Sequence, residues 1–212
     1  MAVTGGQPLG ERPRLAVAIG ASAGGPQALQ TLLAEFPTEV PVPVLVVQHI
    51  PPRFVGALVR RLQEASPLPI RVAAAGEVVR AGLVYVAPGG RHLTVRRGLR
   101  GSQLILHLSD APPRHGVRPA ADLLFGSLAE ACEAGAIVVV LTGMGKDGLE
   151  GVRAVKAKGG VAVAEAEESC VVYGMPRALA EAALADVVVP LPEMPRALGA
   201  ILRERAAVLA AR

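Results

Sequence analysis

The stretch LAVAIGASAGGP, residues 15–26, decides the fold because an apolar run passes into a glycine-rich loop and then reaches a proline. Gly20 and Gly24 stand two residues either side of Ser22, which is the Gly-x-Ser-x-Gly spacing of a nucleophile elbow. In such an elbow a sharp strand-to-helix turn strains the serine and requires small neighbours. Pro26 sets a helical φ and lacks an N–H that the first helical turn leaves unpaired, so it predicts a helix start there. A hydroxyl placed in this way could attack an ester.

The composition of the 212 residues indicates one globular domain over residues 14–212, preceded by a short flexible tail over residues 1–13. Hydrophobic residues make up 51% of the chain but aromatic residues only 2%, which predicts a core of small aliphatic side chains. Apolar runs are too short to span a bilayer and the N-terminus does not resemble a signal peptide, so we expect a cytoplasmic protein without membrane insertion. The net charge of +4 is spread along the chain, and with so few aromatics we expect an acidic protein surface rather than nucleic acid as partner.

Strand and helix patterns alternate after the tail. The β-branched runs at Val44–Gln48 and at residues 136–141 are typical of parallel strands covered on both faces. Strands at residues 83–86, 93–96 and 104–108 are joined by glycine-rich turns, which predicts an antiparallel hairpin insertion. The pattern therefore predicts a three-layer α/β fold, a mostly parallel sheet flanked by helices. Apolar positions at helical spacing predict helices over residues 26–35, 54–64, 121–133, 149–158, 176–185 and 195–210.

Polar motifs follow three of the predicted strands, at the edge where open α/β sheets gather their sites. Ser22 follows the first strand, His49 follows the second, and Asp147 lies in the loop TGMGKDG after the strand at residues 136–141. A serine nucleophile needs a base, and the base needs a third group to hold its tautomer. Of the four histidines, only His49 ends a strand of the strongly buried type. Of the four aspartates, only Asp147 lies in a glycine-rich loop at the carboxyl end of a predicted strand. The sequence predicts a Ser-His-Asp triad, in a chain order that differs from three familiar serine hydrolase folds.

Other polar residues have less specific interpretations. His92 and His107 fall in the hairpin region and are interpreted as structural, whereas His115 is either a solvated loop residue or a substrate contact. Asp122 begins a predicted helix, so capping is the simplest role for it. The two cysteines lack the spacing of a metal or redox pair. A dinucleotide loop is disfavoured because a serine stands where the middle glycine of Gly-x-Gly-x-x-Gly is required.

Six motifs, over roughly residues 15–190, resemble in sequence and order those of the catalytic domain of the bacterial chemotaxis protein-glutamate methylesterase (CheB type). The resemblance implies a parallel α/β sheet with an antiparallel hairpin, and it places the triad on Ser22, His49 and Asp147. The motifs are AIGASAGGPQAL, VVQHIPPRF, AGLVYVAPGGRHL, RPAADLLFGSLA, VVVLTGMGKDG and ESCVVYGMPRAL.

The resemblance also implies a reaction. Members of this family hydrolyse glutamate γ-methyl esters on the cytoplasmic helices of chemoreceptors, releasing methanol without a cofactor, and some deamidate receptor glutamines. Carried over, the backbone amides of Ala23 and Met144 are candidates for the oxyanion hole. Lys146, Arg118 and Arg177 are candidates for contact with the acidic receptor surface.

Two departures from the family pattern bear on function. Ala23 stands where the family usually has threonine, which removes a hydroxyl beside the nucleophile. Family members usually carry an N-terminal receiver domain, and the 13 residues before this domain are too few for one. Either the protein works without direct phospho-control, or control comes from a separate phospho-receiver protein. Two alternative functions follow: a non-catalytic receptor-binding module, or an esterase for a non-receptor ester.

Overall fold

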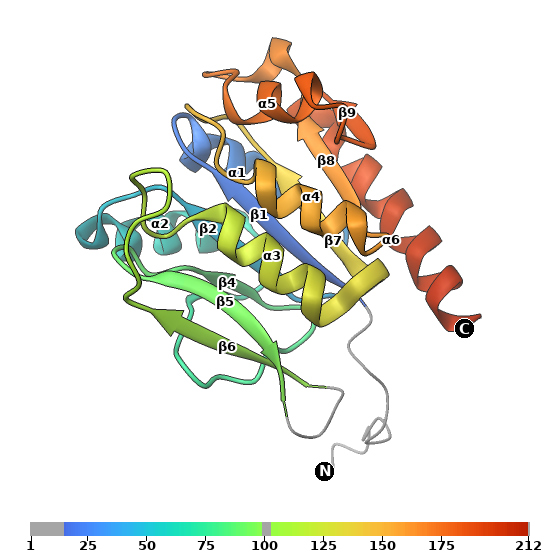
Figure 1. Cartoon of the computed structure of the whole chain (residues 1–212), viewed down its shortest axis with the longest axis horizontal. Helices are drawn as coiled ribbons and strands as arrows, with labels where there is room; N and C mark the ends of the chain where they lie inside the picture. The colour runs from blue at the N-terminus through green and yellow to red at the C-terminus, as the bar shows by residue number, and fades with distance from the viewer. Residues whose placement is uncertain (1–14, 99–102, 212) are drawn as a thin grey trace.

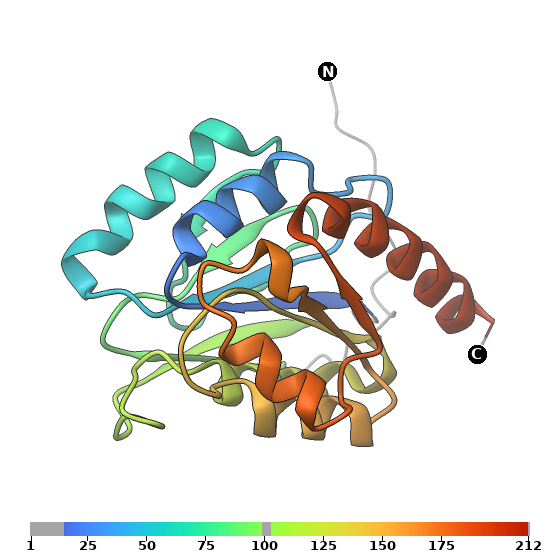
Figure 2. The ribbon, with the colours of Figure 1, turned by 90° about the horizontal axis from the view of Figure 1, so that it is seen from above.

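Residues 15–98 and 103–211, which the computed structural model describes, contain a seven-stranded parallel sheet with helices on both faces (Figure 1 and Figure 2). In spatial order, its strands are β3 (Ile70–Val72), β4 (Val84–Val86), β2 (Val44–Gln48), β1 (Ala16–Ala21), β7 (Ala136–Val140), β8 (Val161–Glu165) and β9 (Val187–Val189). A separate antiparallel pair consists of β5 (His92–Arg97) and β6 (Leu104–Ser109). The predicted three-layer architecture is confirmed.

The helices connect the strands and form the outer layers. The α-helices are α1 (Gly25–Ala34), α2 (Pro52–Ala65), α3 (Ala121–Cys132), α4 (Leu149–Ala157), α5 (Met175–Glu181) and α6 (Met194–Ala210). Short 3-10 helices lie at Glu133–Gly135, Glu167–Ser169 and Leu191–Glu193.

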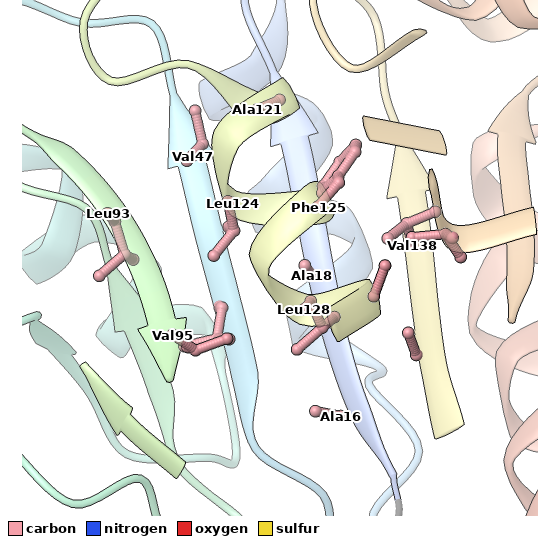
Figure 3. Packing of buried hydrophobic residues seen from close by; sticks show 14 of the residues in the cluster. Ala16, Ala18, Val47, Leu93, Val95, Ala121, Leu124, Phe125, Leu128 and Val138 are labelled. Carbon is pink, nitrogen blue, oxygen red and sulfur yellow. The ribbon is translucent and has the colours of Figure 1, made fainter. Parts of the chain in front are cut away.

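Successive side chains of β1 enter different helix layers, because side chains alternate along a strand. Val17 and Ile19 pack with α1, α2 and α6, while Ala16 and Ala18 pack with α3, α4 and α5. Figure 3 shows α3 lying across the central strands, with three apolar side chains directed toward them: Leu124, Phe125 and Leu128. All of these side chains are fully buried. Two cores therefore fix the central strands and the positions of their carboxyl ends.

Strand β4 corrects the prediction for residues 83–86, which placed them in the hairpin. Val84–Val86 pair in parallel with β2 and β3 and are fully buried. So short a run has too little periodicity to distinguish a buried parallel strand from a hairpin strand. Strands β3 and β9, with three residues each, are missing from the prediction for the same reason, and the five-residue β8 is missing as well. The hairpin of β5 and β6 is confirmed.

The turn between β1 and α1 differs from the predicted elbow in the residue that takes the unusual backbone conformation. Gly24 has a positive φ of 79°, whereas Ser22 is not among the described residues with positive φ. Glycine adopts this conformation without a Cβ clash, so the turn needs no left-handed strain at Ser22. The Ser22 carbonyl accepts a hydrogen bond from Gly25 N at 2.9 Å, and α1 begins at Gly25 with Pro26 in its first turn. The helix start beside Ser22 is confirmed.

Two remaining predictions concern the ends of a helix and of the chain. Helix α5 ends at Glu181, short of the predicted residue 185, and Ala183 just beyond it has a left-handed φ of 52°. The tail predicted over residues 1–13 lies outside the described residues. In the described ranges, no helix is both long and apolar enough to cross a bilayer.

Candidate active site

The carboxyl ends of three neighbouring strands bring Ser22, His49 and Asp147 to one edge of the sheet. β1 pairs with β2 up to Ala21 and Gln48, so Ser22 and His49 follow at the same level. β1 also pairs with β7, whose following loop carries Asp147. Backbone hydrogen bonds fix the first residues beyond the strands: His49 N donates to the Ala21 carbonyl at 3.0 Å. The structure thus brings the three predicted side chains to neighbouring positions.

His49 and Asp147 form a largely buried hydrogen-bonded pair. His49 Nε2 lies 2.7 Å from Asp147 Oδ2, and the two side chains are 11% and 3% exposed. An ionised carboxylate can only accept hydrogen bonds, so Nε2 carries the proton and Nδ1 remains as the acceptor of the imidazole. In the described part of the chain, no hydrogen bond joins Ser22 Oγ to His49. Such bonds are often long before substrate binds.

Asp147 is held ionised by the donors around it. Its Oδ2 also accepts a hydrogen bond from Ala121 N at 2.7 Å, and its Oδ1 accepts one from Asp122 N at 3.0 Å. Burial alone would raise the pKa of Asp147, but the hydrogen bonds from His49 and from these two amides outweigh it and lower the pKa below its usual 3.8. The carboxylate is therefore charged at neutral pH and can orient His49.

Asp122 supports this arrangement through a contact that its place in the sequence does not reveal. Its Oδ1 accepts hydrogen bonds from Gly148 N and Gly151 N, both at 2.9 Å, so it caps α4 rather than its own helix. Asp147 in turn binds the first amides of α3. Asp122 Oδ2 pairs with His115 Nε2 at 2.8 Å and with Arg114 Nε at 3.2 Å. The two aspartates cross-cap two helices and lock the Asp147 loop to α3.

One group of three side chains in the described ranges has possible metal-ligating atoms close together. His115, Asp122 and Asp147 offer such atoms within 4.8 Å of one another. The two carboxylates already accept hydrogen bonds from His49, Arg114, His115 and backbone amides.

The loop that carries Asp147 packs closely against the serine turn. A Cβ on Gly143 would lie 2.7 Å from Ser22 Cβ, so only glycine fits there. Thr142 Oγ1 donates to the Ala23 carbonyl at 2.9 Å, and the Thr142 carbonyl accepts the Ser22 N–H at 3.0 Å. The amides of Ala23 and Met144 donate no hydrogen bond within the described residues. Both are available to a ligand beside Ser22.

The three predicted substrate contacts lie in different surroundings. Lys146 and Arg177 line a cleft of about 450 Å³ beside the Asp147 loop. Arg177 also pairs with Glu181 on the surface of α5 at 2.7 Å. The Arg118 Nη1 instead donates to two carbonyls of its own loop, those of Asp110 and Ala111.

The remaining histidines and the thiols lie outside the triad. His92 is fully buried and bonded to the Pro112 carbonyl and to Ala120 N, as expected of a structural histidine. Burial raises the pKa of Cys132 and of Cys170 to about 12, so both thiols stay protonated at neutral pH. Neither cysteine therefore offers a thiolate nucleophile at neutral pH.

Comparison with known families identifies the family of the chain. The CheB methylesterase family model matches residues 17–198. The chain belongs to the CheB methylesterase family. A solved member, the CheB methylesterase catalytic domain of Thermotoga maritima, is 40% identical with a TM-score of 0.85, covering 88% of this chain and 98% of that one.

Curated CheB relatives extend beyond the matched region. The protein of Desulfitobacterium hafniense is 51% identical over 90% of this chain and 48% of its own length. That of Geobacillus kaustophilus is 45% identical over 91% of this chain and 55% of its own length. Both are named protein-glutamate methylesterase/protein-glutamine glutaminase. The chain spans about half the length of these curated relatives.

Proposed function

We propose that this CheB-family chain hydrolyses γ-methyl esters of glutamate side chains on methylated chemoreceptors in the cytoplasm, releasing methanol. The observation that carries the proposal is the His49–Asp147 pair, 2.7 Å apart, beside Ser22 at the carboxyl edge of the sheet. The names of the relatives support the same substrate class.

The first half of the reaction transfers the glutamyl group to the serine. Ser22 Oγ attacks the ester carbonyl while His49 Nδ1 takes its proton. The oxyanion of the tetrahedral intermediate lies against the amides of Ala23 and Met144, which have no other acceptor within the described residues. The C–O bond to the methoxy group then breaks, and His49 returns the proton to the departing oxygen as methanol. Asp147 stabilises the imidazolium throughout.

The second half frees the enzyme. His49 takes a proton from water, the resulting hydroxide attacks the glutamyl ester of Ser22, and the serine leaves with the proton. The products are the original serine hydroxyl and a glutamic acid side chain, which loses its proton to solvent. A primary amide can follow the same path with ammonia in place of methanol, which matches the second activity in the relatives' names.

The cleft beside the Asp147 loop supports an acidic protein substrate. Lys146 on its wall can attract carboxylates flanking the methylated glutamate, whereas the charge of Arg177 is already paired with that of Glu181. Exposed charges of this kind act through screened attraction. Lys146→Glu should therefore raise KM with little change in kcat, and the effect should shrink as salt rises. Lys158→Glu, at the far end of α4, is the matched control.

The test is methanol release from methylated receptor, compared with hydrolysis of a small ester. The proposal predicts a much higher kcat/KM on the receptor. Hydrolysis of the small ester alone would favour a non-receptor esterase, and receptor binding without hydrolysis of ester or amide would favour a binding module.

A further inference from the structure

Gln48, the last residue of β2, is a buried polar residue for which the proposed reaction has no role. It is 2% exposed and precedes His49 directly. Its carboxamide has two N–H donors and a carbonyl acceptor, and buried groups of this kind normally find partners. The partners that it takes therefore indicate what it holds in place.

The amide nitrogen of Gln48 joins the two segments that carry the nucleophile and the base. Nε2 donates to the Ser22 carbonyl at 2.8 Å and to the His49 carbonyl at 3.2 Å. The backbone ladder between β1 and β2 has ended at this level, its last bond running from His49 N to the Ala21 carbonyl. Within residues 15–98 and 103–211, no other hydrogen bond of Ser22 reaches β2 or the turn after it. Gln48 thus supplies the connection where the backbone no longer can.

The amide oxygen of Gln48 shows that this orientation is specific. Oε1 is buried without a hydrogen-bond partner and lies against Gly25, where a Cβ would come within 2.0 Å of it. Turning the amide over would bring Oε1 against the two carbonyl oxygens, and three acceptors would repel one another. A buried acceptor without a partner destabilises the fold. In this orientation Oε1 lies unpaired beside Gly25, and Nε2 donates to the carbonyls of Ser22 and His49.

From these contacts we infer that Gln48 is a positioning residue, whose amide clamps the carbonyl of Ser22 to that of His49 and so sets the separation of nucleophile and base. The inference rests on the proposed roles of those two residues. Gln48 acts through their backbone and touches no reacting atom. Misplacement of reacting groups by about 1 Å can cost on the order of 10²-fold in rate. The clamp therefore increases the rate of the step at Ser22 Oγ and leaves substrate binding unchanged.

A glutamine elsewhere in the fold offers the matched control. Gln63 in α2 donates through Nε2 to the Leu68 carbonyl at 3.3 Å and accepts Ile70 N at 2.7 Å. It ties a helix to β3 away from the serine. Loss of its amide should lower stability only.

The experiment measures phosphorylation of Ser22 in the full chain by diisopropyl fluorophosphate. In this reaction Ser22 Oγ bonds to phosphorus, fluoride leaves, and His49 takes the proton. Gln48→Met keeps the side-chain volume but removes both donors. We expect its maximal labelling rate to fall at least roughly tenfold while the half-saturating reagent concentration changes less than about twofold. Gln63→Met should match wild type in both. A Gln48→Met rate within about twofold of wild type, or an equal loss in Gln63→Met, would overturn the inference.

A second variant keeps the inference testable if Gln48→Met does not fold. Gln48→Glu has the same shape, but only its protonated carboxyl can donate to a carbonyl. Its labelling rate relative to wild type should therefore rise as pH falls. A ratio near one at every pH would overturn the clamp. Since the probe reads Ser22 alone, labelling of wild type without methanol release would refute the proposed substrate and leave this test intact.

Discussion

Replacing Asp147 with asparagine keeps the shape of the side chain but removes its charge and one of its acceptors. Asp147 Oδ2 accepts from His49 Nε2 and Ala121 N, and Oδ1 accepts from Asp122 N. If the asparagine NH₂ faces His49, the histidine proton must move to Nδ1, and the base for Ser22 is lost. If the amide oxygen faces His49 instead, the tautomer survives, but NH₂ opposes Asp122 N–H and no charge stabilises the imidazolium.

Both orientations have consequences of known size. At least one buried amide at the start of α3 loses its acceptor, which costs about 1–3 kcal/mol of unfolding free energy. General-base catalysis contributes about 10²–10⁴-fold, and a wrong tautomer in the protease triad costs about 10⁴-fold in kcat. We therefore expect Asp147→Asn to lower kcat for methanol release between about 10²- and 10⁴-fold.

The assay combines kcat for methanol release with urea unfolding. Asp186→Asn is the matched control, because Asp186 Oδ2 also accepts a backbone N–H, that of Ala162 at 2.8 Å, at the opposite end of β8 from Glu165. It should lower stability while leaving kcat near wild type. An Asp147→Asn kcat within about threefold of wild type would refute the assignment of Asp147 as the group that orients His49.

Three further predictions follow from the same contacts. Because hydrogen bonds lower the pKa of Asp147, its carboxylate stabilises the folded state above the usual value of 3.8, and this contribution is lost as pH falls through the lowered pKa. The difference in unfolding free energy between wild type and Asp147→Asn should shrink in urea titrations as pH falls below 3.8; a constant difference would contradict it. Gly143→Ala should destabilise the fold by about 1–3 kcal/mol and slow turnover, since the added Cβ would meet Ser22. Gly126→Ala in α3 has nothing within 4 Å of the added Cβ and should stabilise the fold by about 0.5–1 kcal/mol. Calorimetry of the two variants measures both changes. Iodoacetamide at neutral pH should leave methanol release unchanged, because Cys132 and Cys170 have pKa values of about 12; inhibition that Cys170→Ser abolishes would refute this.

The parts of the fold that could be predicted are those with strong local patterns. The runs that form β1, β2 and β7 are buried and, apart from Gln48, apolar, so their parallel arrangement is visible in the sequence. The short sequence of β4 resembles that of a hairpin strand, and only its parallel pairing with β2 and β3 shows that it lies inside the main sheet. The Gly-x-Ser-x-Gly spacing predicts a strained serine, because the nucleophile serine is strained in the elbows of α/β-hydrolases. In this structure Gly24, and not Ser22, takes the left-handed conformation.

The clustering of Ser22, His49 and Asp147 could be predicted because all three follow strands that end at one edge of the sheet. The residues that support it could not, because their roles depend on contacts between distant segments. Asp122 is separated by 26 residues from the Gly148 amide that it caps, and Gln48 by the same number from the Ser22 carbonyl. Aspartate at a helix start indicates a cap, but not which helix receives it. Glutamine before a histidine carries no recognisable signal for an amide that bridges two strands.

The proposed function depends on Ser22 as the nucleophile of a protein-glutamate methylesterase. Methanol release from methylated receptor, measured for wild type and Ser22→Ala at matched folding and receptor binding, tests it most directly. We expect Ser22→Ala to bind the receptor but to release methanol only at the background rate. Equal rates for the two proteins would contradict it.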